Sequence, residues 1–171
     1  MKILYQGSPG AYSHLAALEV YPDAEIIPCK TFDECFSRAQ KDEKLKIIIP
    51  ESNKTTGNIG IEYLIFKYRL NIYAEHFHKI EHNLLGLPGA KITDIKNVLS
   101  HAQGLSQCSN YIKKNNLTEN VRADTAGSAE FVSKNQKIFD AAIASKLSAK
   151  IYNLEIIASN IENEKVNTTR F

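Results

Sequence analysis

The sequence predicts an α/β fold with mainly parallel sheets, and three observations lead to that expectation. Short runs rich in Ile, Leu and Val recur along all 171 residues. Stretches with apolar residues at helical spacing separate most of these runs, and this alternation is typical of α/β proteins. Neither a repeat nor a low-complexity linker interrupts it. The length suits one domain or two small lobes that share the chain.

The elements follow one another in a regular rhythm. The first strand, KILYQ, runs into the turn GSPG and then into a helix. The second helix begins with Thr31 and Glu34 at capping-box spacing. A polar loop, 51–60, follows the third strand, and an unusually long extended stretch covers 70–90. The expected strands are 2–6, 24–29, 44–50, 97–100, 121–124, 140–144 and 154–159, and the expected helices are 11–21, 31–42, 61–68, 101–114, 125–134 and 145–152.

Composition and charge exclude several classes of protein. Hydrophobic residues make up 43% and charged residues 23% of the chain, which is ordinary for a globular protein. A formal net charge of +2, with Lys and Arg scattered, predicts neither a nucleic-acid nor a membrane partner. The N-terminus has no signal-peptide pattern. The three cysteines, Cys29, Cys35 and Cys108, lack CxxC spacing, so we expect reduced thiols and a cytoplasmic protein.

Polar turns follow four of the expected strands. In open α/β sheets ligands bind at this edge, where free N–H groups and helix dipoles point. The turns are rich in hydroxyls and amides and poor in carboxylates, which suits an anionic small molecule and suits a metal poorly. They are Gly7–Ser13, Asn53–Gly57, Ser100–Gln103 and Asp124–Ser128.

Three histidines, His76, His78 and His82, have even spacing and would share one face of a regular strand. A zinc site is conceivable there. Imidazoles that face solvent or line a cleft are the favoured interpretation, because no Cys or carboxylate completes a set at ligand spacing. We therefore expect no metal.

An ordered series of motifs runs along nearly the whole chain. The motifs are GSPGAYSHLAA, NKTTGNI, IEHNLL, VLSHAQGLSQC, ADTAGSA, AAIASKLSAKIYNL and the terminal NTTRF. In order and spacing this series resembles the catalytic domain of prephenate dehydratase. The resemblance implies a two-lobed α/β structure, similar in layout to periplasmic binding proteins, with the site in the inter-lobe cleft. The first lobe would hold 1–73 and 160–171, and the second 74–159.

The resemblance implies decarboxylative dehydration of prephenate to phenylpyruvate, a step of phenylalanine synthesis. Loss of CO2 and hydroxide makes the ring aromatic, so no cofactor is needed. The protein has to hold a dianion, orient it and stabilise charge on the departing hydroxyl.

By the same resemblance, the catalytic residues are Thr169, beside the leaving hydroxyl, and the amides Asn53 and Gln103. A Thr hydroxyl is a poor proton source, so Thr169 is interpreted as a polarised donor. Arg170 is a candidate for a substrate carboxylate, although it could equally brace its lobe from behind. The remaining candidates for substrate binding are Ser8, Ser52, Lys54, His82, Ser100, His101 and Thr125.

The chain departs from the family pattern at the second motif. The family usually has Glu-Asn-Ser or Glu-Asn-Thr where this chain has Ser52-Asn53-Lys54. Glu51 is one position early, and in a strand that shift points a side chain to the opposite face. Lys54 adds a cation that could help hold the dianion. His101-Ala102-Gln103 also replaces the usual His-Pro-Gln.

Other interpretations stay open. Arogenate dehydratase differs only in the substrate's amino group, and a two-lobed binder of a small anion needs no catalysis at all. A prephenate decarboxylase is disfavoured by Thr169. The chain carries neither the chorismate mutase segment nor the ACT domain common in the family, so we expect a shortened chain or an unregulated catalytic domain. A homodimer is a candidate assembly.

Overall fold

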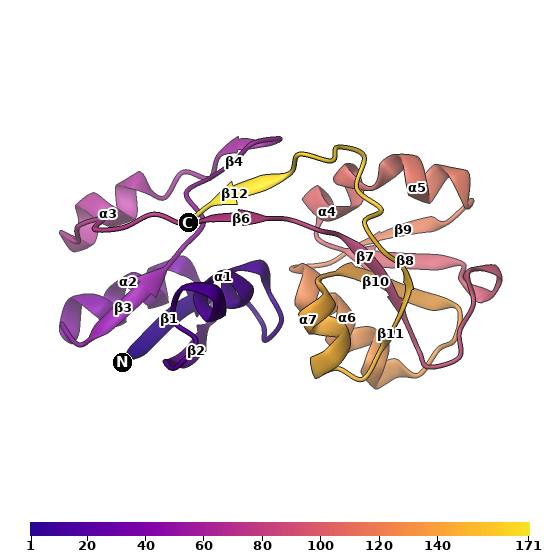
Figure 1. Cartoon of the computed structure of the whole chain (residues 1–171), viewed down its shortest axis with the longest axis horizontal. Coiled ribbons are helices and arrows are strands. Elements are labelled where there is room, and N and C mark those ends of the chain that lie inside the picture. Colours follow the sequence, from indigo (N-terminus) through magenta and orange to yellow (C-terminus); the bar gives the residue numbers. More distant parts are fainter. The chain divides into compact units, whose positions relative to one another are not determined.

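The computed structural model describes residues 1–171, and the chain divides into two compact units. Unit 1 contains residues 1–8, 12–80 and 166–171, and unit 2 contains residues 9–11 and 81–165. These boundaries lie several residues from the expected 73/74 and 159/160. The reason is that strand β6 (Phe77–Lys79) pairs with strand β12 (Thr168–Arg170) and so belongs to unit 1. Figure 1 shows both strands beside the C-terminus.

The first sheet of unit 1 is parallel and is covered on both faces. It has the order β2-β1-β3, from β1 (Lys2–Gln6), β2 (Glu25–Cys29) and β3 (Leu45–Ile48). Alternation along β1 sends Leu4 into a cluster with Cys35, Phe36 and Leu64. Tyr5 points the other way and stacks on His14, with ring centroids 5.1 Å apart. One face therefore packs on α1 (Tyr12–Val20), and the other on α2 (Phe32–Lys41) and α3 (Glu62–Tyr68).

Helix α2 begins where the capping spacing predicts. The Thr31 side chain accepts a hydrogen bond from the backbone N–H of Glu34 at 3.1 Å. The Glu34 carboxylate accepts from the N–H of Lys30 at 2.8 Å, one residue before the N-cap. These two hydrogen bonds satisfy one N–H group of the helix's first turn, that of Glu34, and the N–H of Lys30 just before the helix.

The second sheet of unit 1 is antiparallel, which the sequence did not predict. Its order is β5-β4-β12-β6, with β4 at Ser52–Asn53 and β5 at Gly57–Asn58. The segment 51–60, expected as a loop, forms the β4–β5 hairpin. The motif NTTRF supplies the inner strand β12, flanked by β4 and β6 (Figure 1).

Unit 2 contains one mixed sheet of order β11-β7-β10-β8-β9, in which β7 runs antiparallel to both of its neighbours. Neighbouring residues alternate between two cores. Leu84 and Ala141 face the cluster with Leu105 and Ile112, while the next residues, Leu85 and Ala142, face the opposite cluster. The strands are β7 (Asn83–Gly86), β8 (Asn97–Ser100), β9 (Thr118–Val121), β10 (Asp140–Ala144) and β11 (Glu155–Ala158).

The helices of unit 2 follow the predicted ranges with one exception. The helix expected over 101–114 is two helices, α4 (Ala102–Gln107) and α5 (Ser109–Lys114), broken at Cys108. Cys108 has φ −114° and ψ 13° and is fully buried in the core, as a small hydrophobe would be. No helix combines the length and apolar character needed to cross a bilayer. The other elements are α6 (Thr125–Asn135), α7 (Lys146–Ile151) and the 3-10 turn η1 (Ile92–Asp94).

Candidate active site

The predicted residues of unit 1 gather around the buried amide of Asn53. Its Nδ2 donates to Thr169 Oγ1 at 2.8 Å and to Asn167 Oδ1 at 2.9 Å. Its Oδ1 accepts from the backbone N–H of Thr55 at 2.9 Å and from the Thr55 hydroxyl at 2.6 Å. Because a backbone N–H can only donate, the orientation of the amide is fixed. Asn53 thus acts as a rigid bridge between hairpin and terminal strand.

Thr169 is the central member of a row across the antiparallel sheet. In the register it lies opposite Asn53 of β4 on one side and His78 of β6 on the other. Directly opposite residues share one face, and all three are less than 9% exposed. The Thr169 oxygen accepts the Asn53 proton, so the hydroxyl's own proton is available to a ligand. The geometry thereby makes Thr169 a hydrogen-bond donor.

Arg170 and Ser52 face the other way. They are paired in the register one step from Thr169, so alternation puts both on the opposite face. Arg170 Nε donates to Glu75 at 2.8 Å, and its Nη1 lies 3.6 Å from Glu51. The Ser52 hydroxyl donates to Glu51 at 2.5 Å. This arrangement fits the bracing alternative for Arg170, because a substrate carboxylate would have to displace two protein carboxylates.

Asn167 is a site residue that the sequence interpretation missed. It is 1% exposed, its Oδ1 accepts from Asn53, and its Nδ2 is buried without a hydrogen-bond partner. A buried unsatisfied amide costs about 1–3 kcal/mol. A ligand acceptor beside Asn53 would remove that cost. The available signal was the spacing of two between Asn167 and Thr169, which sets both side chains on one face of an extended strand.

Two further predicted residues lie at the edges of unit 1. Lys54 is exposed, and its backbone N–H donates to Thr168 O at 2.9 Å, which extends the β4–β12 ladder. Only its backbone takes part in this ladder. Ser8 is partly buried in the turn after β1, where the chain leaves unit 1.

In unit 2 the predicted residues lie at two helix N-termini. The His101 side chain caps α4 by accepting from the Gln103 N–H at 3.3 Å. Thr125 is the first residue of α6, after the N-cap Asp124. A Cβ at Gly104 would lie 2.8 Å from the Ser100 oxygen and 3.5 Å from Thr125 Cγ2, so these residues converge. Two helix starts, together with the Thr125 hydroxyl, form a local environment that favours an anion.

Two of these side chains have structural partners. The buried Ser100 hydroxyl donates to Ile143 O at 2.8 Å, which ties β8 to β10. His82 is 2% exposed, and its Nε2 lies 2.8 Å from Gln107 Oε1. Burial lowers the pKa of His82, so its ring is neutral at pH 7. Both side chains are thus hydrogen-bonded to other protein groups, which gives them a structural role.

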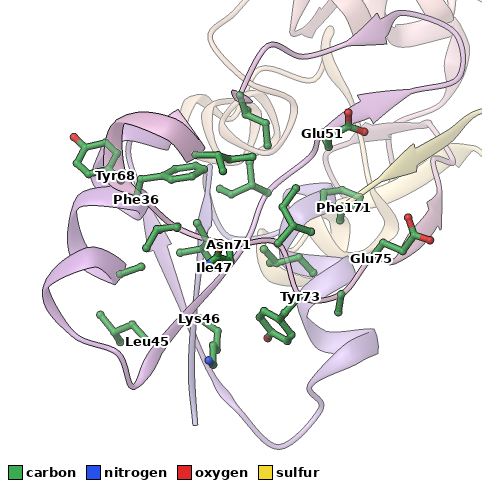
Figure 2. Close-up of a pocket in the computed structure, with 18 of the residues that line it drawn as sticks. Phe36, Leu45, Lys46, Ile47, Glu51, Tyr68, Asn71, Tyr73, Glu75 and Phe171 are labelled. Carbon is green, nitrogen blue, oxygen red and sulfur yellow. The ribbon is translucent and has the colours of Figure 1, made fainter. Parts of the chain in front are cut away.

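A pocket of about 690 Å³ in unit 1 contains no residue of this polar row in its lining. Figure 2 shows its lining, with Phe36, Tyr68 and Tyr73 among the labelled rings and Glu51 and Glu75 among the carboxylates. Neither Thr169 nor Asn53 lines it. Its lining is mainly apolar and combines carboxylates with the cations Lys46, Arg69 and Arg170. Because it contains no member of the Asn53–Thr169–His78 row, we do not assign it as the candidate site.

The chain is similar to known proteins over its whole length. Arogenate dehydratase/prephenate dehydratase 1 of Arabidopsis thaliana is 41% identical over 172 residues, which is 100% of this chain and 44% of the relative. The chain therefore spans less than half of that relative's length. A structure described as GqqA, a novel type of quorum quenching acylase, superposes with a TM-score of 0.91 at 35% identity, over 100% of this chain and 62% of that one.

The prephenate dehydratase of Staphylococcus aureus superposes with a TM-score of 0.84 at 27% identity, over 100% of this chain and 64% of that one. The family model of prephenate dehydratase matches residues 3–171, a range that holds both the Asn53–Thr169 row and the helix starts of unit 2. The chain belongs to the prephenate dehydratase family.

Proposed function

We propose that the chain is the catalytic part of a prephenate dehydratase, a carbon–oxygen lyase. The observation that carries the proposal is the hydrogen bond from Asn53 to the Thr169 oxygen, because it leaves the threonine proton for an external acceptor. The departing oxygen of prephenate is such an acceptor. As the C–O bond breaks, negative charge grows on that oxygen and the hydrogen bond from Thr169 strengthens.

The rest of the reaction is driven by the substrate. The ring carboxylate leaves as CO2, its electron pair enters the ring, and the hydroxyl leaves with the electrons of the C–O bond. The hydroxide is neutralised by a proton from solvent, so Thr169 ends the cycle with its own proton. Within unit 2, the N-termini of α4 and α6 form a local environment suited to a carboxylate. No step of this scheme calls for a cofactor.

Thr169→Val is the direct test. Valine keeps the shape of threonine and removes the hydroxyl, so we expect kcat for conversion of prephenate to phenylpyruvate to fall by roughly 10²–10³-fold. Thr169→Ser is the matched control and should keep most of the activity, because it keeps the donor. Phenylpyruvate is followed by absorbance against the spontaneous background. A Thr169→Val enzyme as fast as the wild type would overturn the proposal.

The same assay separates the rivals. The name of the Arabidopsis relative carries both arogenate and prephenate, so arogenate is tested in parallel, and the substrate with the higher kcat/KM decides between the two dehydratases. The similarity to the GqqA acylase brings a second candidate, hydrolysis of an N-acyl amide. Release of free acid from such an amide without dehydration would favour it. Tight prephenate binding with no turnover would favour a binding protein.

A reducing compartment such as the cytoplasm remains part of the proposal. Its support is cysteine chemistry: Cys29, Cys35 and Cys108 are all buried free thiols. The Arabidopsis relative is named as chloroplastic.

A further inference from the structure

Three potential metal ligands meet in unit 1. One of them, His78, lies opposite Thr169 in the sheet, but none of the three has an assigned part in the proposed reaction. Glu19 Oε2 of helix α1 lies 2.8 Å from His76 Nε2 and 2.9 Å from His78 Nδ1. All three ligand atoms lie within 4.8 Å of one another. The two imidazoles are two residues apart in an extended segment, so they share one face and point at the same carboxylate.

We propose that Glu19, His76 and His78 form a binding site for a divalent zinc-class ion. Each nitrogen that now faces the carboxylate presents the lone pair that a metal needs once its proton is lost. A tetrahedral ion with bonds of about 2.0–2.1 Å needs ligand atoms roughly 3.3 Å apart. The two N–O separations are already within about half an ångström of that value.

The set has one fixed ligand and two adjustable ones. The His78 side chain is 10% exposed and packs beside the rings of Tyr12 and Phe171, which hold it in place. The side chains of His76 and Glu19 are 30% and 47% exposed, so both can rotate toward an ion with little repacking. A fixed anchor with mobile partners is enough to close three ligands around a metal.

The ligand chemistry selects the metal. Two imidazoles and one carboxylate suit Zn²⁺, Co²⁺ or Ni²⁺, whereas Mg²⁺ and Ca²⁺ prefer sets made of oxygen. Three protein ligands leave a fourth position, and the exposed side at Glu19 gives water access to it.

The sequence could not reveal this set. His76 and His78 were visible as a pair, but Glu19 is 57 and 59 residues away along the chain. His82, the third histidine of the motif, lies beyond the end of β6 and belongs to unit 2, so it does not join them. The carboxylate that completes the set comes from packing of α1 against β6.

The test is metal binding to the purified full chain, independent of dehydratase activity. Zn²⁺ is titrated by calorimetry after chelator treatment, and Co²⁺ reports coordination through its visible absorption. We expect one ion per chain and a higher melting temperature with Zn²⁺. His78→Phe should weaken binding by at least about 100-fold, and Glu19→Gln by roughly 10–100-fold, losses of the size that follow from removing a ligand from such a site.

Folding of the variants is controlled. Phenylalanine at 78 keeps an aromatic ring beside Tyr12 and Phe171, and glutamine at 19 keeps an acceptor for both imidazoles. His14→Phe is the matched control, because His14 lies on the same helix as Glu19 and uses its ring to stack on Tyr5. It should bind Zn²⁺ as the wild type does. Absence of Zn²⁺ binding by the wild type, or equal binding by His78→Phe, would show a hydrogen-bonded cluster only and overturn the proposal.

Discussion

Asn53 determines what Thr169 can do. Its side-chain Nδ2 donates to Thr169 and Asn167, and its Oδ1 accepts from Thr55. The amide therefore cannot flip without losing these hydrogen bonds. A threonine hydroxyl has one proton, and the direction of that proton depends on its neighbour. The chemistry of Thr169 is therefore set by a residue of the hairpin as much as by Thr169 itself.

Asn53→Asp tests that dependence with almost no change in shape. The carboxylate still accepts from Thr55, but it has no proton to give, so Thr169 must donate to it and turn its proton away from the substrate. We expect kcat to fall roughly 10²-fold at neutral pH, measured with prephenate. The folded fraction is checked by circular dichroism. Unchanged turnover in a folded Asn53→Asp enzyme would mean that the hydrogen bond does not orient Thr169.

At the scale of elements, the GSPG turn has a structural role that the sequence left undecided. Residues Pro9–Ala11 pack on helix α7 within unit 2. The hydroxyls of Ser145 and Ser148 both donate to Gly10 O, at 2.6 and 3.1 Å, and the Tyr152 hydroxyl donates to Pro9 O at 2.8 Å. Gly10 has φ +94°, and a Cβ there would lie 2.5 Å from Ser148 Oγ.

Gly10→Ala should therefore combine backbone strain with a steric clash. Gly89 provides a matched control, because its φ is +81° and a Cβ there would meet nothing within 4 Å. We expect Gly89→Ala to lower the free energy of unfolding by about 1–2 kcal/mol and Gly10→Ala to lower it by a further ~1–3 kcal/mol, typical of overpacking. Urea denaturation measures both. Equal losses would show that the segment can move off α7 at no cost.

At the scale of the whole molecule, the buried His82 and the partly buried His14 make stability depend on pH. Burial lowers the pKa of His82 in unit 2 and of His14 in unit 1. In the unfolded chain each titrates near 6.5, so below that pH the unfolded state binds more protons than the folded state. Their contribution to stability is complete above pH 6.5 and is lost as the pH falls toward the folded pKa.

We expect the free energy of unfolding to fall between pH 7 and pH 5.5, by up to about 1.4 kcal/mol per pH unit for His82 and by less for the partly exposed His14. Carboxylates contribute little in this window, because their ordinary pKa values lie lower. His82→Gln keeps a hydrogen-bonding partner for Gln107 and should flatten the profile, measured by urea titration at several pH values. If the slope in His82→Gln were unchanged, the pH dependence of unfolding would come from groups other than His82.

Local patterns predicted many of the strands and helices, whereas pairing between distant segments could not be predicted from them. The strands and helices of the parallel sheet and the cap at Thr31 depend on residues close in sequence. The antiparallel sheet does not. Its strands are two or three residues long, too short to show a period, and their pairing depends on contacts between distant segments.

The candidate site shows the same division. The family resemblance indicated Thr169 and Asn53, and the register brings them together. It left open whether Arg170 binds the substrate or braces its lobe, because the direction of that side chain follows only from the pairing of β12 with β4. Asn167 was missed since its importance lies in an unpaired amide, which no sequence pattern displays.

The inner position of β12 also has a consequence for folding. Thr169 accepts a hydrogen bond from a residue 116 positions earlier in the sequence. In the sheet, β12 lies between β4 and β6 and joins them. Contacts of such long sequence separation form late, because the loop-closure entropy is lost before they contribute. Until β12 inserts, the β4–β5 hairpin and β6 present unpaired strand edges, the surfaces through which partly folded chains associate. Assembly of the Asn53–Thr169 pair and protection of those edges are therefore one kinetic event.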